Sequence, residues 1–220
     1  MLMDTLHVIT CLCLILHQAH GHLRNVATSN PKIQESIVNT HNRLRQQVNP
    51  PASDMLKMEW NTEAQRNAYN VARLCSFLHS FPSQRKITRP IRAQCGENIF
   101  MSSDETDWDS VIQSWYDEKE FFEYGYGTID QDEMVGHYTQ VVWSTSFLVG
   151  CAVNYCSDTD FPFLYICHYC PQGNMIGKEH RPYESGRPCS TCRNSCEGKL
   201  CKKLPGNKQN LDDVQKKTVG

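Results

Sequence analysis

Two glutamates fall at positions that a folded domain would bury. Glu118 lies three residues after Trp115, on the apolar face of a predicted helix. Glu97 alternates with Cys95 and Ile99 in a strand-like segment, on the face that we expect to point inward. A buried carboxylate needs a cation, a metal ion or several hydrogen-bond donors. Both are therefore candidate functional acids, although Glu118 could also reach water from the edge of its helix.

Four histidines in the same part of the chain could join these acids. They are His41, His79, His137 and His168. Two imidazoles and two carboxylates together suit a divalent metal ion or general acid–base catalysis. Composition and pattern alone leave open which of the histidines take part.

Helices must position some of these side chains. The sequence predicts helices from residue 31 to the stop at Pro50, over residues 62–75, and from about 107 to 122. Asn30 followed by Pro31 is typical of a helix start, and Thr62 with Gln65 predicts a capping box for the second helix. The third helix carries Glu118.

Three segments rich in β-branched and aromatic residues predict strands at 95–101, 147–155 and 163–170. The last two flank the turn-rich segment 157–160, which favours an antiparallel hairpin. Helices packed on an antiparallel sheet give an α+β, layered domain ending near Gly173.

Composition bounds the class of protein. The chain has 220 residues, of which 40% are hydrophobic and 10% aromatic, enough for one sizeable core and too many for a disordered chain. Its 22 Lys and Arg nearly balance 24 Asp and Glu, which argues against binding to nucleic acid. Residues 1–170 hold 12 basic and 19 acidic side chains, whereas 171–220 hold 10 and 5. This difference in charge predicts different functions for the two parts of the chain.

The N-terminus predicts secretion. The apolar run over residues 6–16 is too short to span a bilayer, and Ala19-His20-Gly21 provides small residues for signal peptidase. We expect residues 1–21 to form a signal peptide cleaved after Gly21; a buried N-terminal helix is the alternative. The mature chain is then extracellular.

Ten cysteines follow the predicted cleavage point, an even number in an oxidising compartment, so five disulfides are expected. The residues alone leave the pairing open. Zinc binding by the Cys-x-x-Cys pairs at 167–170 and 189–192 is the alternative. Residues 174–201 read as a Pro- and Gly-rich linker and a small cysteine-rich hinge held by its own cross-links, and 202–220 as a disordered basic tail.

Several motifs resemble one family. The runs Gly-His-Tyr-Thr-Gln-Val-Val-Trp at 136–143 and Leu-Tyr-Ile-Cys-His-Tyr-Cys-Pro-Gln-Gly-Asn at 164–174 resemble the two signatures of the CAP superfamily. His41-Asn42-x-x-Arg45, the run 51–60 and Cys-Gly-Glu-Asn at 95–98 resemble its cysteine-rich secretory proteins, or CRISPs. The resemblance covers roughly residues 30–201.

The resemblance implies an α-β-α sandwich, the CAP domain, over residues 22–173. It also implies a cleft tetrad of His79, Glu97, Glu118 and His137, in which zinc is held by His79 and His137 and the acids orient water or the imidazoles. The disulfides that it implies are Cys75–Cys156, Cys95–Cys170, Cys151–Cys167, Cys189–Cys196 and Cys192–Cys201.

The chain departs from the family at its end, because the six-cysteine C-terminal domain of full-length members does not follow the hinge. Ion-channel regulation belongs to that domain and is not expected here. Shortened members of the family are the nearer likeness, and they imply sperm binding, fertilisation or sperm attraction.

The leading hypothesis is a secreted, non-enzymatic protein that binds a cell-surface receptor or membrane component on sperm, with zinc or another divalent ion in the cleft. A metal-assisted hydrolase with Glu97 or Glu118 as general base is the alternative. No His-Glu-x-x-His or Gly-x-Ser-x-Gly motif supports it. A sterol or lipid carrier is a third hypothesis, in which the aromatic residues at 121, 122, 124 and 126 either line a site or belong to the core.

Overall fold

The computed structural model describes residue 23 and residues 25–202. The predicted signal peptide and all of the predicted tail except Lys202 lie outside the described residues. Within the described part of the chain, no helix is long and apolar enough to cross a membrane.

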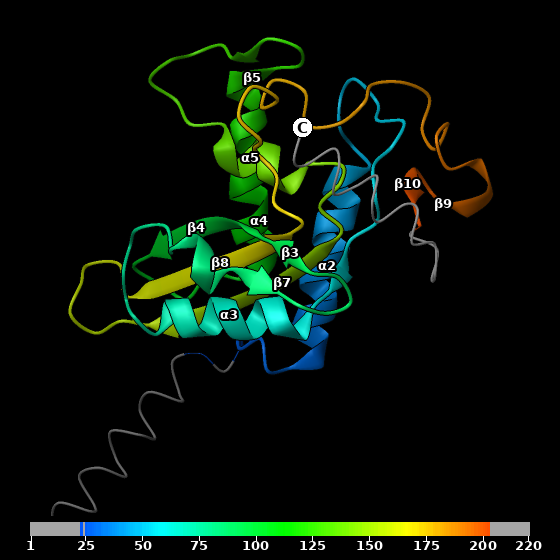
Figure 1. The fold of residues 1–220 in the computed structure, drawn as a ribbon. Helices are drawn as coiled ribbons and strands as arrows, with labels where there is room; N and C mark the ends of the chain where they lie inside the picture. Colours follow the sequence, from blue (N-terminus) through cyan, green and yellow to red (C-terminus); the bar gives the residue numbers. More distant parts are fainter. Residues whose placement is uncertain (1–22, 24, 203–220) are drawn as a thin grey trace, which may run out of the picture.

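A four-stranded sheet forms the centre of the molecule (Figure 1). Its strands run in the order β1 (Glu59–Trp60), β7 (Leu148–Tyr155), β8 (Phe163–Cys170) and β4 (Gly96–Ser102). The three predicted strands are confirmed as β4, β7 and β8, and β7 and β8 form the predicted antiparallel hairpin. The sequence did not predict β1, which pairs with β7 in parallel and makes the sheet mixed.

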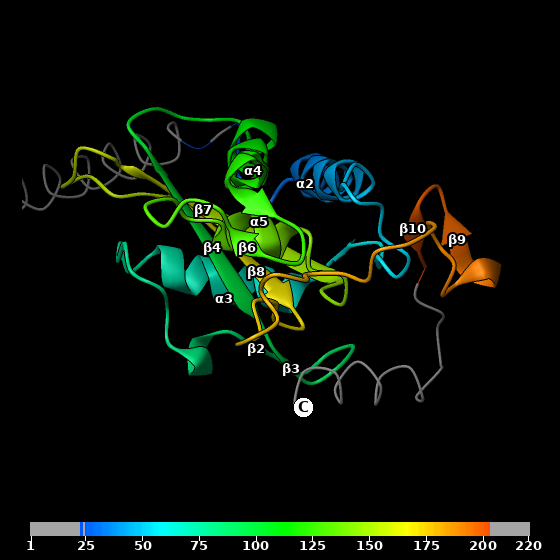
Figure 2. The same ribbon diagram turned by 90° about the horizontal axis from the view of Figure 1, so that it is seen from above.

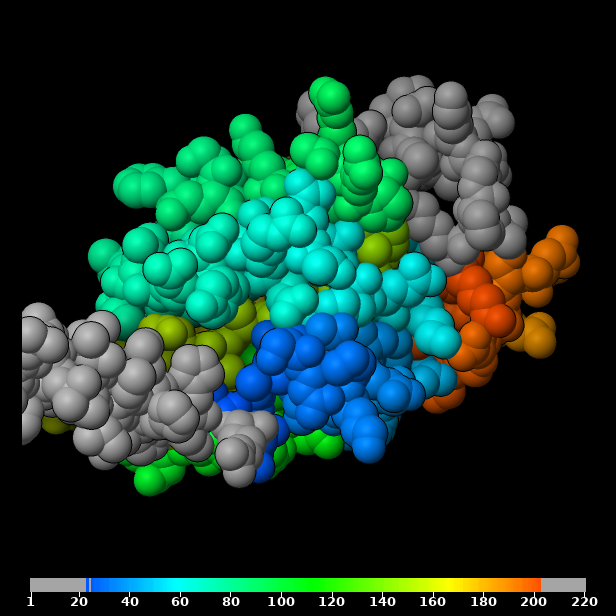
Figure 3. Space-filling model, turned by 90° about the horizontal axis from the view of Figure 1, so that it is seen from below, coloured from blue at the N-terminus to red at the C-terminus, as the bar shows by residue number. Residues whose placement is uncertain are grey.

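Helices cover both faces of this sheet (Figure 1). One face carries α3 (Thr62–Ala72), and the other carries α2 (Pro31–Arg45), α4 (Trp108–Asp117) and the short α5 (Gly136–Val141). Figure 2 shows α2 and α4 side by side. Figure 3 shows the opposite face, where α3 (cyan) lies beside the segment just before α2 (blue), and Gln65 donates to the carbonyl of Thr28. The α-β-α sandwich is therefore confirmed.

Short elements lie around this framework. They are η1 (Pro82–Gln84), η2 (Glu118–Phe121) and η3 (Arg193–Ser195), and the paired strands β2 (Lys86–Ile87) with β3 (Ala93–Gln94), β5 (Phe122–Glu123) with β6 (Gly127–Thr128), and β9 (Cys196–Glu197) with β10 (Leu200–Cys201).

Three predicted helix boundaries were wrong. The first helix begins at Pro31, capped by Asn30 as predicted, but ends at Arg45, five residues before Pro50. The second ends at Ala72 and not at Cys75. It is capped by Asn61, whose side-chain oxygen accepts from the amide of Ala64, so the predicted capping box at Thr62 is displaced by one residue. In the third, the α-helix stops at Asp117 and the chain tightens into η2.

Close packing holds α3 against the sheet. A Cβ atom on Gly150 of β7 would lie 2.2 Å from the amide nitrogen of Gln65 and 2.5 Å from the carbonyl oxygen of Asn61. The first turn of α3 therefore rests directly on the backbone of β7, a distance that no larger residue allows.

Five disulfides cross-link the described chain. They join Cys75–Cys156, Cys95–Cys170, Cys151–Cys167, Cys189–Cys196 and Cys192–Cys201. These are the pairs that the family resemblance implied, and they rule out thiolate zinc binding by the two Cys-x-x-Cys segments.

The hinge is held by more than its own cross-links. Cys201 accepts from the amide of Lys57 at 2.9 Å and donates its own amide to Met55 at 2.8 Å. Leu200 is 2% exposed and belongs to the main core. The hinge, orange to red in Figure 2, is thus packed on residues 55–57 of the body.

His41 is a core residue of α2. Its side chain is fully buried, with Nδ1 2.8 Å from the carbonyl of Ile37 and Nε2 2.9 Å from the hydroxyl of Tyr169. Burial lowers the pKa of His41 to about 4, against the opposing effect of the Ile37 carbonyl. This histidine is not among the residues that line the cleft described below.

The free energy of unfolding is expected to fall as the pH drops from about 6.5 to about 4. In this window the unfolded chain takes up a proton on His41 that the folded protein does not bind, and the loss from this residue is about 3 kcal/mol. Denaturant unfolding at stepped pH measures the slope. His41→Gln cannot take up the proton and should have a shallower slope; an unchanged slope would contradict the assignment.

Candidate functional site

A cleft of about 310 Å³ opens at one end of β4, beside the start of α5. Three members of the predicted tetrad, His79, Glu97 and His137, line it. The fourth, Glu118, lies behind His137 and contacts it directly. The remaining lining residues are Asn98, Met134, Val135, Gly136 and Asn174.

Glu97 is the most enclosed acid of the cleft, with a side chain 0% exposed. Its Oε1 lies 2.9 Å from Nδ1 of His79 and accepts from the amide of Ser80 at 2.9 Å. Its Oε2 accepts from the Ser80 hydroxyl at 2.6 Å and lies 3.0 Å from Nε2 of His168. Burial alone would raise the pKa of Glu97, but these hydrogen bonds outweigh it and hold the pKa far below its usual range. The carboxylate therefore stays charged.

Glu118 binds the first turn of α5. Its Oε2 accepts from the backbone amides of His137 at 2.9 Å and Tyr138 at 3.0 Å, and its Oε1 lies 2.6 Å from Nδ1 of His137. Val135, which precedes α5, offers no side-chain cap, so Glu118 satisfies these amides instead. The indole of Trp115 stacks on the His137 ring with centroids 6.2 Å apart. These contacts supply the several hydrogen-bond donors that the sequence analysis required for a carboxylate at Glu118.

Two asparagines fix the backbone around His137. Asn98 donates to the carbonyl of His137 at 3.1 Å, and Asn174 donates to the carbonyl of Gly136 at 2.8 Å. Thr139 in turn donates to the side chain of Asn174 at 2.8 Å. The start of α5 is therefore held from β4 and from the segment after β8.

The hydrogen bonds of the two histidines leave one nitrogen of each ring available as a ligand. Each imidazole has Nδ1 against a carboxylate, which favours the tautomer that leaves the lone pair on Nε2. Within the described residues, no hydrogen bond occupies Nε2 of either His79 or His137. Two imidazole nitrogens are suitable ligands for zinc and leave its other positions to water or to a bound group.

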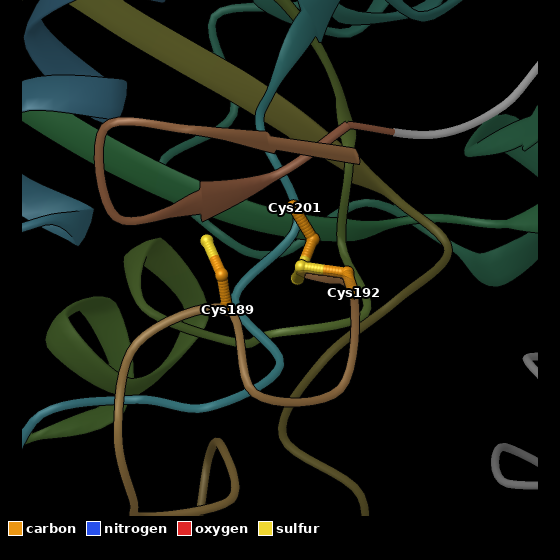
Figure 4. Close-up of side chains that lie close together, drawn as sticks. All are labelled: Cys189, Cys192 and Cys201. Atoms are coloured by element: carbon orange, nitrogen blue, oxygen red, sulfur yellow. A yellow bond between two sulfur atoms is a disulfide. The ribbon is translucent and has the colours of Figure 1, made fainter. Parts of the chain in front are cut away.

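A second cluster of ligand-type atoms lies in the hinge (Figure 4). Among the described residues, the only group of three or more His, Cys, Asp or Glu side chains with ligand atoms within 4.8 Å of one another is Cys189, Cys192 and Cys201. All three are in disulfides and offer no thiolate. The tetrad forms no such group, so a metal ion in the cleft would have two protein ligands.

Sequence reasoning missed one partner of Glu97, Ser80, and left another, His168, without an assigned role. Ser80 follows His79 directly, and its role could have been suspected only from that neighbour. His168 was one of four candidate histidines, but nothing in the sequence placed it opposite Glu97. The register between β4 and β8 does so.

Two of the four aromatic residues after α4, Phe122 and Tyr124, pack against the core, whereas Tyr126 is 74% exposed. The ring of Phe122 packs against Tyr138 at 5.2 Å, and Tyr124 packs against Tyr183 at 5.0 Å. Tyr124 also donates its hydroxyl to the Tyr183 carbonyl at 2.7 Å. These contacts favour the core interpretation of this segment over a lining for a lipid site.

Comparison with known proteins decides the family. Residues 38–169 match the CAP family, described as the cysteine-rich secretory protein family. The chain belongs to this family. Allurin from Xenopus tropicalis is 42% identical to this CRISP-family chain over 203 residues, which are 92% of this chain and 99% of the relative. Human cysteine-rich secretory protein 2 is 47% identical over 175 residues, 79% of this chain and 70% of the relative.

Solved structures agree with this assignment. NaASP2, crystallised with Zn²⁺, is 33% identical to this CRISP-family chain with a TM-score of 0.63, and the match covers 80% of this chain and 97% of that one. The CAP fold expected from the sequence motifs is thus confirmed, together with the likeness to a shortened member of the family.

Proposed function

We propose that this CRISP-family protein is a secreted, non-enzymatic ligand for a component of the sperm surface, acting in fertilisation or sperm attraction. The observation that carries the proposal is the match to allurin, which extends over almost the whole of that shortened relative. The five disulfides suit the extracellular compartment that this function requires.

The cleft supports a binding function over hydrolysis. None of its eight lining residues is Ser, Thr or Cys. The neighbouring Ser80 hydroxyl donates to Glu97, whose pKa is held far below its usual range, so this carboxylate is a weak base for activating a hydroxyl or a water molecule. We propose that the cleft holds a divalent metal ion, with Nε2 of His79 and of His137 as the protein ligands. When bound, the ion would supply a Lewis-acid centre and open positions for a partner's donor groups.

The linker and the hinge together support attachment to an anionic surface. Residues 171–202 carry six Lys and Arg against three Glu. An excess of positive charge on such a segment attracts anionic lipids and glycans. The hinge would then contribute to the contact with the cell, while the cleft faces the receptor.

Saturable binding of labelled mature protein, residues 22–220, is expected on sperm and not on erythrocytes. Unlabelled protein should displace the label from sperm. A matched control is the same protein reduced and alkylated, which keeps the charge of Lys and Arg but loses the fold. Equal binding to both cells, or equal binding by the reduced protein, would show non-specific attachment and refute a sperm ligand.

A further inference from the structure

His168 lies directly behind Glu97 as seen from the cleft. The two residues face each other across the β4–β8 pair, on the side of the sheet covered by α3. The side chain of His168 is 0% exposed and does not line the cleft. Its Nε2 lies 3.0 Å from Oε2 of Glu97. An imidazole within the sheet therefore contacts the carboxylate that contacts His79.

The partners of Glu97 divide between a loop and the sheet. Two of them, His79 and Ser80, are neighbours in the loop after α3, and a loop contact moves with the loop. Arg85 lies further away, with Nη1 3.9 Å from Oε1. His168 is the hydrogen-bonded partner that comes from a central strand. His168 holds Oε2 from the sheet while the Ser80 hydroxyl holds the same oxygen from the loop, and together they fix the plane of the carboxylate and hence the direction in which Oε1 points.

Burying His168 leaves one of its nitrogens unsatisfied. Nδ1 is buried and has no hydrogen-bond partner among the described residues. An apolar side chain at this position would avoid that cost. Within the part of the chain that the structure describes, the hydrogen bond to Glu97 is the one interaction of His168 that an apolar residue could not make, so it is the reason for an imidazole at this position.

We infer that His168 is a positioning residue for the cleft: it orients Glu97, which in turn holds the His79 imidazole with Nε2 toward the metal site. The metal part of this inference rests on the proposed function. Hydrogen-bond partners of metal-binding histidines typically change metal affinity by about 10- to 100-fold, and His168 acts one contact further out. A loss of about tenfold in Zn²⁺ affinity is the effect expected when its donor is removed.

The test combines two variants with zinc titration by calorimetry. His168→Leu removes the donor, and His168→Gln keeps an amide donor that can reach Glu97. The Leu variant should lose about tenfold in Zn²⁺ affinity, and the Gln variant should recover most of it. Tyr165→Phe is the matched control, because it also removes the polar group of a buried β8 side chain. The two hydrogen bonds that it loses join the Tyr165 hydroxyl to the backbone of Thr106, away from Glu97. Equal affinities for wild type and the Leu variant would overturn the inference.

A measurement without metal separates this inference from the proposed function. Nitrogen-15 NMR of the imidazoles should show a proton on Nε2 of His168 in the wild type, because that atom must donate to Glu97. It should also show that His79 loses its preference for a proton on Nδ1 in the Leu variant. A wild type that fails to bind Zn²⁺ would refute the metal site, and these spectra would still decide the role of His168. A bare Nε2 on His168 would refute positioning, even if the Leu variant does not fold.

Discussion

Replacing His79 and His137 together with alanine is expected to abolish Zn²⁺ binding by this protein. Loss of a hydrogen-bond partner outside the ligand shell already weakens metal sites by about 10- to 100-fold, so loss of the ligands themselves should exceed about 100-fold. The two imidazoles are the expected protein ligands, because a carboxylate engages Nδ1 of each and leaves Nε2 available. Zinc titration by calorimetry, with apo protein prepared by chelation, measures the effect.

The matched control for this prediction is His180→Ala. His180 lies outside the cleft, beside Gly127, and its carbonyl accepts from the amide of Gly125. Its side chain should therefore contribute nothing to zinc affinity. If the double variant binds Zn²⁺ as tightly as the wild type, the ion is held elsewhere and the cleft has lost its proposed ligand set. Each single variant should lose most of the affinity, because one imidazole alone makes a weak site.

Arg45→Met is expected to destabilise the fold by about 4 kcal/mol or more, since several buried carbonyls lose their donor at once. Arg45 is 1% exposed and makes six hydrogen bonds to five backbone carbonyls. These carbonyls belong to Leu56, Val141, Trp143, Ser144 and Ser146. The guanidinium thus ties α2 to the loop before β1 and to the segment after α5.

Two variants on the same helix sharpen this prediction. Arg43→Met removes an exposed guanidinium from α2 and should change the free energy of unfolding by less than about 0.5 kcal/mol. The loss in the free energy of unfolding for Arg45→Lys should lie between those for Arg43→Met and Arg45→Met. An ammonium group has three donors and lacks the planar fork that reaches all five carbonyls. Urea unfolding with intact disulfides gives the three values. A loss at Arg45 no larger than that at Arg43 would contradict the role assigned to this network.

The position of Arg45 also explains why a motif in α2 matters for the cleft. Burial lowers the pKa of Arg45 to about 9, while Asp54 and Tyr169 oppose the shift, so the side chain remains charged at neutral pH. Its contacts with Val141 and Trp143 fix the end of α5, and α5 carries His137. Asn42, from the same motif, exchanges two hydrogen bonds with the backbone of Met58. Arg45 therefore stabilises the position of α5, and with it the position of His137 in the cleft.

Local patterns in the sequence were enough for much of this architecture. Strands β7 and β8 follow from apolar, β-branched and aromatic runs separated by a turn, and α2 follows from its Asn-Pro start and helical period. These signals depend on residues close together in the chain, so they can be recognised in the sequence without knowledge of the fold. The motifs were specific enough to indicate the family and the tetrad residues. Helix ends were predicted less well, because the competing caps differ by one residue, as Asn61 and Thr62 do.

The contacts that make the cleft were decided by tertiary structure. Glu118 reaches His137 across 19 residues, and Glu97 meets His168 across 71, through the register of two strands. Periodicity predicts that a side chain is buried, but it carries no information on which distant residue will face it. That choice depends on sheet register and helix packing, which are settled only when the whole core is assembled. The sequence by itself therefore determined the three long strands, helices α2, α3 and α4, the cysteines and the candidate side chains. The packed fold determined β1, α5 and the partners of each side chain.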